Sequence, residues 1–211
     1  MACLRRAIKL DPEYEEAHYN LGCGYRLRRQ YSRAERHLRR AIEIDLAYSL
    51  AYAELGWSLL CHRKGVVHTE EVAESIRLLK KSIKLDPDYG WSRLYLANAL
   101  WGRRRIKSAD EQYSRDIELW PEDSISYWCY GGFLAYEGNN DSLAEEYLRR
   151  AVELDAKDQQ ANYHLGKHLL GWDRKEEAIK FLRKAANQGH EGARKTLREN
   201  GIIVQNVARR S

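Results

Sequence analysis

Proline, phenylalanine and long apolar runs are scarce in this chain of 211 residues. It has three prolines and two phenylalanines, and no stretch of eighteen consecutive apolar residues. The lack of such a stretch argues against a membrane-spanning helix. The N-terminal segment also carries Arg5, Arg6 and Lys9 where a secretory signal would need an apolar core. We therefore expect a soluble, cytoplasmic protein.

Recognisable metal and catalytic patterns are missing as well. The four cysteines lie far apart without a C-x-x-C pair, which suggests neither a disulfide framework nor a zinc site. Cys61, His62 and His68 form the only Cys/His cluster, and their spacing matches no common zinc pattern. The phosphate-binding motifs G-x-x-x-x-G-K and G-x-G-x-x-G do not occur. We expect no metal, no cofactor and no catalytic activity.

What the chain does contain is an internal repeat. Six segments align with one another, and their starts lie 34, 41, 34, 35 and 34 residues apart. They are AIKLDP (7–12), AIEIDL (41–46), SIKLDP (82–87), DIELWP (116–121), AVELDA (151–156) and AANQGH (185–190). Similarity at such a period is typical of stacked two-helix units, each burying its apolar face against its neighbours. All three prolines end such a segment, where a missing backbone donor stops a helix.

Each unit shows two helical patterns. In the second helix, apolar residues four positions apart share a face, as Leu38 and Ile42 do. In the first helix, Leu-Gly pairs recur at Leu21, Leu55 and Leu165, Tyr-Gly occurs once and Leu-Ala once. Glycine in a helix interior costs about 1 kcal/mol relative to alanine. Its recurrence at one register predicts that the paired helices approach closely.

These residues closely resemble the tetratricopeptide repeat (TPR) family, with L-G-x-x-Y in the first helix and A-I-x-L-D-P ending the second. The last repeat also resembles a Sel1 repeat. The resemblance implies an all-α, right-handed superhelical solenoid of antiparallel helix pairs. We expect a half repeat (1–12), repeat 1 (13–48), repeat 2 (49–89) with an enlarged turn (61–71), repeat 3 (90–123), repeat 4 (124–158), repeat 5 (159–190), a capping helix (191–200) and a tail (201–211).

The family resemblance also implies that ligands bind on the concave face, which the first helices line. Four of the six tryptophans fall on the outward positions of those helices. Tryptophan and tyrosine dominate binding hot spots. The predicted peptide-binding groove comprises Tyr19, Cys23, Trp57, Trp91, Leu94, Asn98, Trp101, Trp128, Tyr163 and Lys167. The alternative is that these rings fold back onto their own repeats, or that the C-terminal helix covers them.

A basic run lies between the two helices of repeat 1 and along the second of them. Its members are Arg26, Arg28, Arg29, Arg33, Arg36, Arg39 and Arg40. It could meet an acidic protein, a membrane surface or nucleic acid, although a solvated turn and helix face is the simpler interpretation. With 36 basic against 31 acidic residues the surface is mixed, which argues against nucleic acid as a partner.

The function we expect from the sequence is a non-enzymatic scaffold or adaptor that binds a peptide or an amphipathic helix in an aromatic groove. Many family members hold acidic chaperone tails with Lys, Asn and Arg on successive first helices, and that set is absent here. Two alternatives remain: a self-assembling structural module, or a regulatory segment of a larger enzyme or RNA-associated protein. The half repeat at the N-terminus suggests either a fragment of a longer protein or a homo-oligomer contact.

Overall fold

Every regular element that the structure describes is an α-helix. This computed structural model describes residues 1–62, 70–138 and 140–202, and it contains no strand in those ranges. The predicted all-α fold is therefore confirmed. Most of the predicted enlarged turn (61–71) and of the tail (201–211) lies outside the described residues.

The chain divides into two compact units, Met1–Leu119 and Trp120–Ser211, and each is considered by itself. Unit 1 contains α1 (Ala2–Leu10), α2 (Glu15–Leu27), α3 (Tyr31–Ile44), α4 (Ser49–His62), α5 (Glu70–Leu85), α6 (Gly90–Gly102) and α7 (Ile106–Leu119). Unit 2 contains α8 (Ser124–Glu137), α9 (Asp141–Leu154), α10 (Gln159–Gly171), α11 (Lys175–Asn187) and α12 (Glu191–Glu199).

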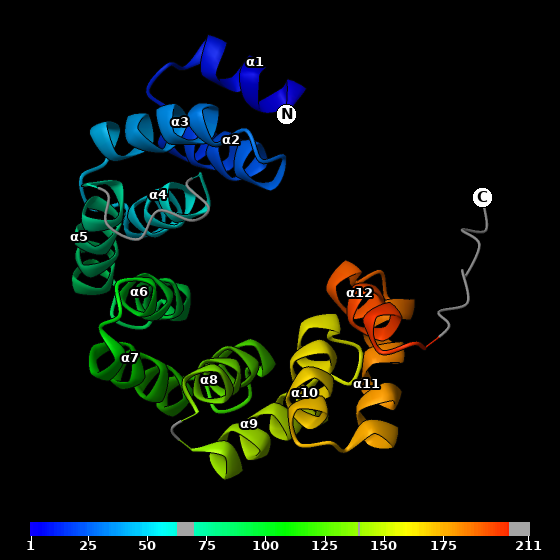
Figure 1. The fold of residues 1–211 in the computed structure, drawn as a ribbon. Coiled ribbons are helices and arrows are strands. Elements are labelled where there is room, and N and C mark those ends of the chain that lie inside the picture. Colours follow the sequence, from blue (N-terminus) through cyan, green and yellow to red (C-terminus); the bar gives the residue numbers. More distant parts are fainter. Residues whose placement is uncertain (63–69, 139, 203–211) are drawn as a thin grey trace. The chain divides into compact units, whose positions relative to one another are not determined.

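In unit 1 the helices form two layers (Figure 1). Each first helix packs on the second helix of its own pair, as α2 does on α3, α4 on α5 and α6 on α7. The first helices α2, α4 and α6 also contact one another in succession, whereas the second helices pack on each other less closely in the described residues. The unit therefore curves with the first helices on its inner side, and we call this side the inner face.

A recurring aspartate explains why several of the second helices stop where they do. Helices α1, α3 and α9 end at Asp11, Asp45 and Asp155 in extended conformation. A side-chain oxygen of each aspartate accepts the backbone N–H two residues later, at 3.0, 2.8 and 2.8 Å. Such a turn competes with continuation of the helix. The aspartate turn thus ends one helix and allows the first helix of the following repeat to begin.

Glycine permits the close approach of the paired helices that the sequence predicts. A Cβ added to Gly22 would lie 2.5 Å from Leu38 Cγ, and one on Gly56 would lie 2.8 Å from Leu79 Cγ. The same contact recurs in unit 2, where a Cβ on Gly166 would lie 2.7 Å from Leu182 Cγ. Real Cβ atoms essentially never come closer than 3.0 Å to another heavy atom. The prediction of close approach is confirmed.

Unit 2 repeats the arrangement with α8 on α9 and α10 on α11. The short α12 packs on α11 and α10, and it lies within the range predicted for a capping helix (191–200). Its Ala193 and Leu197 are fully buried in one cluster with Leu182 and Ala185 of α11. Burial of this kind stabilises a terminal repeat, whose apolar face would otherwise be open to water.

Candidate functional site

The inner face of unit 1 has a buried ion pair at its centre. Arg26 Nε on α2 donates to Glu54 Oε2 on α4 at 2.6 Å. Glu54 is only 5% exposed, whereas the Arg26 side chain retains 20% of its accessible surface. A buried carboxylate needs a charged partner in a fixed place. The pair therefore holds α2 and α4, which belong to successive repeats, in one arrangement.

Neutral polar groups surround this pair. Burial, together with the charge of Glu54, raises the pKa of Cys23 to about 11 and that of Tyr89 to about 12. Burial also raises the pKa of Tyr19, which is hydrogen-bonded to Cys23. The thiol of Cys23 therefore stays protonated near neutral pH, and a protonated thiol is a poor nucleophile. Tyr19 and Cys23 offer a partner hydrogen-bonding and apolar surface rather than reactivity.

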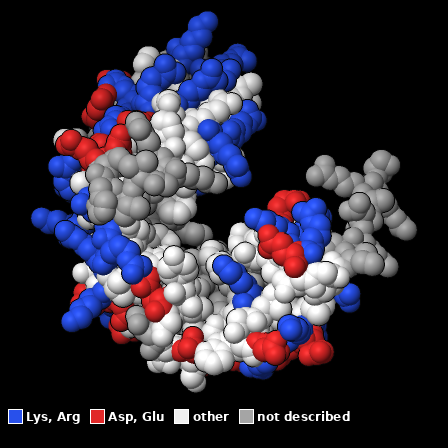
Figure 2. Space-filling view, in the orientation of Figure 1, with Lys and Arg blue, Asp and Glu red and all other residues white. Residues whose placement is uncertain are grey.

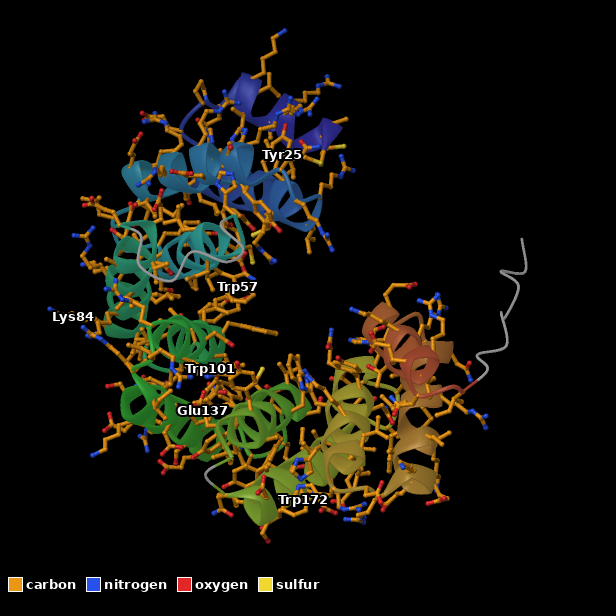
Figure 3. The ribbon with its side chains drawn as sticks, in the orientation of Figure 1. Tyr25, Trp57, Lys84, Trp101, Glu137 and Trp172 are labelled. Carbon is orange, nitrogen blue, oxygen red and sulfur yellow. The ribbon has the colours of Figure 1, made fainter. Side chains whose placement is uncertain are left out.

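Beside the ion pair, three aromatic rings stack across α4 and α6. Trp57 lies parallel to Tyr95, with 4.5 Å between the ring centroids and 7° between the planes. Trp91 leans against the same tyrosine at 5.7 Å and remains 41% exposed. Figure 3 shows Trp57 on the inner face, whereas Lys84 of α5 points away on the opposite side. One side of each tryptophan is thus held by Tyr95, and part of each remains open to solvent.

Not every predicted groove residue in unit 1 is available at the surface. Leu94 is only 3% exposed, so the expectation that it faces outward is wrong. Because α6 packs against α4, α5 and α7, it has fewer free positions than an isolated helix pair would suggest. Asn98 bonds within the unit, since its Nδ2 donates to the Leu94 carbonyl and its Oδ1 accepts from Tyr113. Trp101 is partly buried near the end of α6 (Figure 3).

In unit 2 the predicted rings form a second stack. Trp128 of α8 lies parallel to His164 of α10, with 5.2 Å between centroids and 13° between the planes. Tyr163 meets His164 edge to face and stacks on His190 at 4.2 Å. Lys167, also on α10, is exposed. One face of Trp128 is therefore covered by internal packing. This fits the alternative that the aromatic rings pack within the protein better than a fully open groove.

The histidines in this stack are neutral near pH 7. Burial lowers the pKa of His164 to about 4, and the nearby Lys167 and His190 act in the same direction. Burial likewise lowers the pKa of His190, although Asp158 and Glu191 oppose it. An uncharged imidazole can stack on tryptophan or tyrosine without bringing a buried charge. The sequence alone does not predict the roles of His164 and His190, because nothing in the repeat period places them beside a ring of the neighbouring repeat.

The basic run does not form a single cationic surface. Arg26 pairs with Glu54, Arg39 with Glu35 and Glu74, and Arg40 with Glu13 and Glu43. The remaining members are exposed: Arg28, Arg29, Arg33 and Arg36. Arg29 occupies the turn between α2 and α3 with a φ of 58°. About half of the run is therefore neutralised by carboxylates, which supports a solvated helix face for those members.

Other classes of site receive no support from the geometry. In the described ranges, no three Cys, His, Asp or Glu side chains gather as metal ligands would. The predicted Cys/His cluster is only partly described, because His68 lies outside those ranges. The four cysteines, all of them within the described part of the chain, carry thiols rather than disulfides. No described helix is long and apolar enough to cross a membrane.

Family models match parts of both units. A tetratricopeptide repeat model matches residues 15–48, which cover α2 and α3. A Sel1 repeat model matches residues 125–155 and 159–190. The Sel1 likeness predicted for the last repeat is therefore confirmed, and it extends to the repeat before it. No curated protein matches the sequence of the chain.

Solved structures with similar folds are themselves helical-repeat proteins. TTC0263, a thermophilic TPR protein of Thermus thermophilus, has a TM-score of 0.74 at 19% identity, over 89% of this chain and 97% of that one. A chain of the APC/C hetero-tetramer Cut9-Hcn1 has a TM-score of 0.79 at 15% identity, over 94% of this chain and 39% of that one. YrrB, described as a TPR protein with an unusual peptide-binding site, has a TM-score of 0.57 at 21% identity, over 92% and 97% of the two chains.

At these identities the likeness establishes the fold alone. Together with the helix pairs, it gives the chain a TPR-like helical-repeat fold, in which residues 15–48 match a tetratricopeptide repeat model and residues 125–155 and 159–190 match a Sel1 repeat model.

Proposed function

We propose that the chain is a non-enzymatic interaction module whose unit 1 binds a peptide or an amphipathic helix along α2, α4 and α6. The observation that carries this proposal is the pair of tryptophans on the inner face. Trp57 and Trp91 are both braced by Tyr95, yet Trp91 keeps 41% of its surface exposed. A large ring held in place yet open to solvent is the kind of residue that dominates binding energy.

Rigidity of the face supports the same conclusion. The Arg26–Glu54 pair joins α2 to α4, and the Trp57–Tyr95 stack joins α4 to α6. A partner therefore meets a surface that is already ordered, which lowers the conformational entropy lost on binding. Tyr19 and Cys23 extend the face along α2 with neutral polar groups, and Trp101 extends it along α6.

The similarity of the repeats to known repeat families supports the same proposal. Tetratricopeptide and Sel1 repeats generally mediate contacts between proteins, and they are typically non-enzymatic. A solved protein of similar fold, YrrB, is described as having a peptide-binding site. Unit 2 offers a separate candidate surface with Trp128, Tyr163 and Lys167, of which Lys167 is the most open. We give unit 1 priority because Trp91 keeps 41% of its surface exposed, whereas Trp128 is partly buried.

The test begins with peptides selected from a random library on the full chain, whose affinities are then measured by calorimetry. Trp91→Ala should weaken binding at least about tenfold, because truncation of a hot-spot residue costs about 2 kcal/mol or more. Trp172→Ala is a matched control, because Trp172 is 56% exposed and belongs to unit 2. Far-UV circular dichroism of both variants should match that of the wild type. Equal affinity of the wild type and the Trp91→Ala variant would contradict the proposal.

A further inference from the structure

A recess in unit 1 lies among helices α1, α2 and α3. Its volume is about 430 Å³, and it is lined by Ile8, Pro12, His18, Arg36, His37, Arg40 and Glu43. Figure 2 shows Lys and Arg atoms gathered on the visible surface over α1–α3. The recess and its cationic rim, which we call the basic groove, are separate from the inner face and independent of the proposed function.

Two arginines, one on α1 and one on α3, converge on Tyr25 of α2 at one end of this groove, and Arg36 lines the recess itself. Arg5 Nη2 on α1 donates to the Tyr25 hydroxyl at 3.0 Å. The Arg33 guanidinium on α3 lies over the same ring, 5.8 Å from its centroid. His37 also stacks on the Tyr25 ring, with 5.5 Å between the ring centroids, and Arg36 is its sequence neighbour. Arg5 lies 28 residues from Arg33, so folding alone brings these cations together.

No carboxylate balances the charge of this cluster. Among the described residues, Arg5, Arg33 and Arg36 make no ion pair, whereas Arg40 at the far end binds Glu13 and Glu43 at 3.4 and 3.2 Å. The pKa of His37 falls to about 4 through burial, with His18, Arg36 and Arg5 all acting in the same direction. The groove therefore has an uncompensated positive potential, and an anion placed there would be attracted.

The floor of the groove contributes a polar group without a firm partner. His18 is 8% exposed, and its Nδ1 lies 3.1 Å from Nδ1 of His37. One of these nitrogens must carry the proton and the other must accept it. Nε2 of His18 has no hydrogen-bond partner among the described residues. Burial lowers the pKa of His18, and the nearby backbone carbonyl of Pro12 opposes that shift. That carbonyl favours the tautomer in which Nε2 of His18 carries hydrogen and can donate.

We infer that the basic groove binds an acidic peptide segment that carries an apolar residue. Carboxylates of the segment meet Arg5, Arg33 and Arg36, whose guanidinium groups pair well with carboxylates. The apolar side chain enters the recess beside Ile8 and Pro12. The pair α8 and α9 differs at these positions, because Tyr127 and Tyr147 stand where α2 and α3 have His18 and His37, and the two tyrosine rings pack at 5.6 Å.

Other anionic partners fit the groove less well. RNA-binding proteins of this charge usually offer open aromatic rings for base stacking, and Tyr25 is only 6% exposed. A flat membrane surface would meet protruding cations more readily than a recess lined by Ile8, Pro12 and His18. The chemistry of the groove therefore favours a narrow chain with carboxylates and an aliphatic side chain.

The experiment uses the full chain and a capped pentapeptide with two glutamates on each side of a leucine. Calorimetry should detect binding that weakens as salt is added, because the contacts are between charges near the surface. The double variant Arg33→Gln, Arg36→Gln should bind at least about tenfold more weakly. The double variant Lys80→Gln, Lys84→Gln removes the same charge from exposed positions of α5 and should bind as the wild type does. Trp91→Ala should also have no effect, which separates this site from the inner face.

A second readout reports from inside the groove. On saturation with the peptide, the pKa of His37 measured by NMR should rise from about 4, because new carboxylates offset Arg5 and Arg36. A glutamine version of the peptide should leave it unchanged. The inference is overturned if the glutamate peptide does not bind, if both double variants lose affinity equally, or if a short RNA, inorganic phosphate or an anionic vesicle binds more tightly through the same arginines.

Discussion

Replacing Gly22 with alanine tests the close helix packing on which every repeat depends. Alanine in a helix interior is about 1 kcal/mol more favourable than glycine, so an open site would gain stability. At Gly22 the new methyl group would lie 2.5 Å from Leu38 Cγ, the branch point of a side chain that is 0% exposed. Overpacking of a buried site costs about 1–3 kcal/mol, and this overlap lies at the upper end. We expect a net loss of about 1–2 kcal/mol in the free energy of unfolding.

Urea unfolding followed by circular dichroism measures this change, and two further variants fix its cause. In a Leu38→Ala background the overlap disappears, so Gly22→Ala should become stabilising by up to about 1 kcal/mol. Gly102→Ala is the matched control, because a Cβ there would meet nothing within 4 Å, and it should cause no loss. A Gly22→Ala variant as stable as the wild type, or an equal effect in both backgrounds, would contradict this view of the helix packing.

Two further predictions concern buried charge. Arg26→Ala leaves Glu54 buried without its partner and should cost about 2–3 kcal/mol of unfolding free energy. Glu54→Gln in the same background should recover part of this loss. Urea unfolding that shows no loss for Arg26→Ala would contradict the importance of the ion pair. The pKa of His164 is about 4 in the native state against an ordinary value of 6.5, so the unfolded chain takes up its proton first as the pH falls. The free energy of unfolding should therefore drop by about 2–3 kcal/mol between pH 6.5 and 4. His164→Phe, which keeps a ring beside Trp128, should make that drop smaller. An unchanged pH dependence in this variant would contradict the lowered pKa of His164.

The repeat period was enough to predict the fold, because each residue that carries it acts locally. Asp11, Asp45 and Asp155 stop a helix through their own side chains, and Gly22 and Gly56 mark close contact within one pair. Interactions of this kind span few residues or recur at one register. Comparison of the chain with itself therefore reveals them without knowledge of the neighbouring repeat.

The candidate site was less predictable, because it depends on contacts between successive repeats. The period places Trp128 on an inner position, but it gives no reason why His164 should cover its ring. Leu94 was wrongly assigned to the surface, since its exposure was judged from its own helix pair alone. The convergence of Arg5 and Arg33 on Tyr25 likewise follows from the packing of α1 and α3 on α2, which the sequence does not encode as a motif.

The most direct test of the account is an NMR spectrum of the indole N–H groups during titration with a peptide selected for binding. The chain has six tryptophans, and each gives one such signal. We predict that the signals of Trp57 and Trp91 shift on binding, whereas that of Trp172 stays in place. Binding that shifts only Trp172, or that leaves Trp57 and Trp91 unmoved at saturation, would contradict the assignment of the inner face as the site where a partner is held.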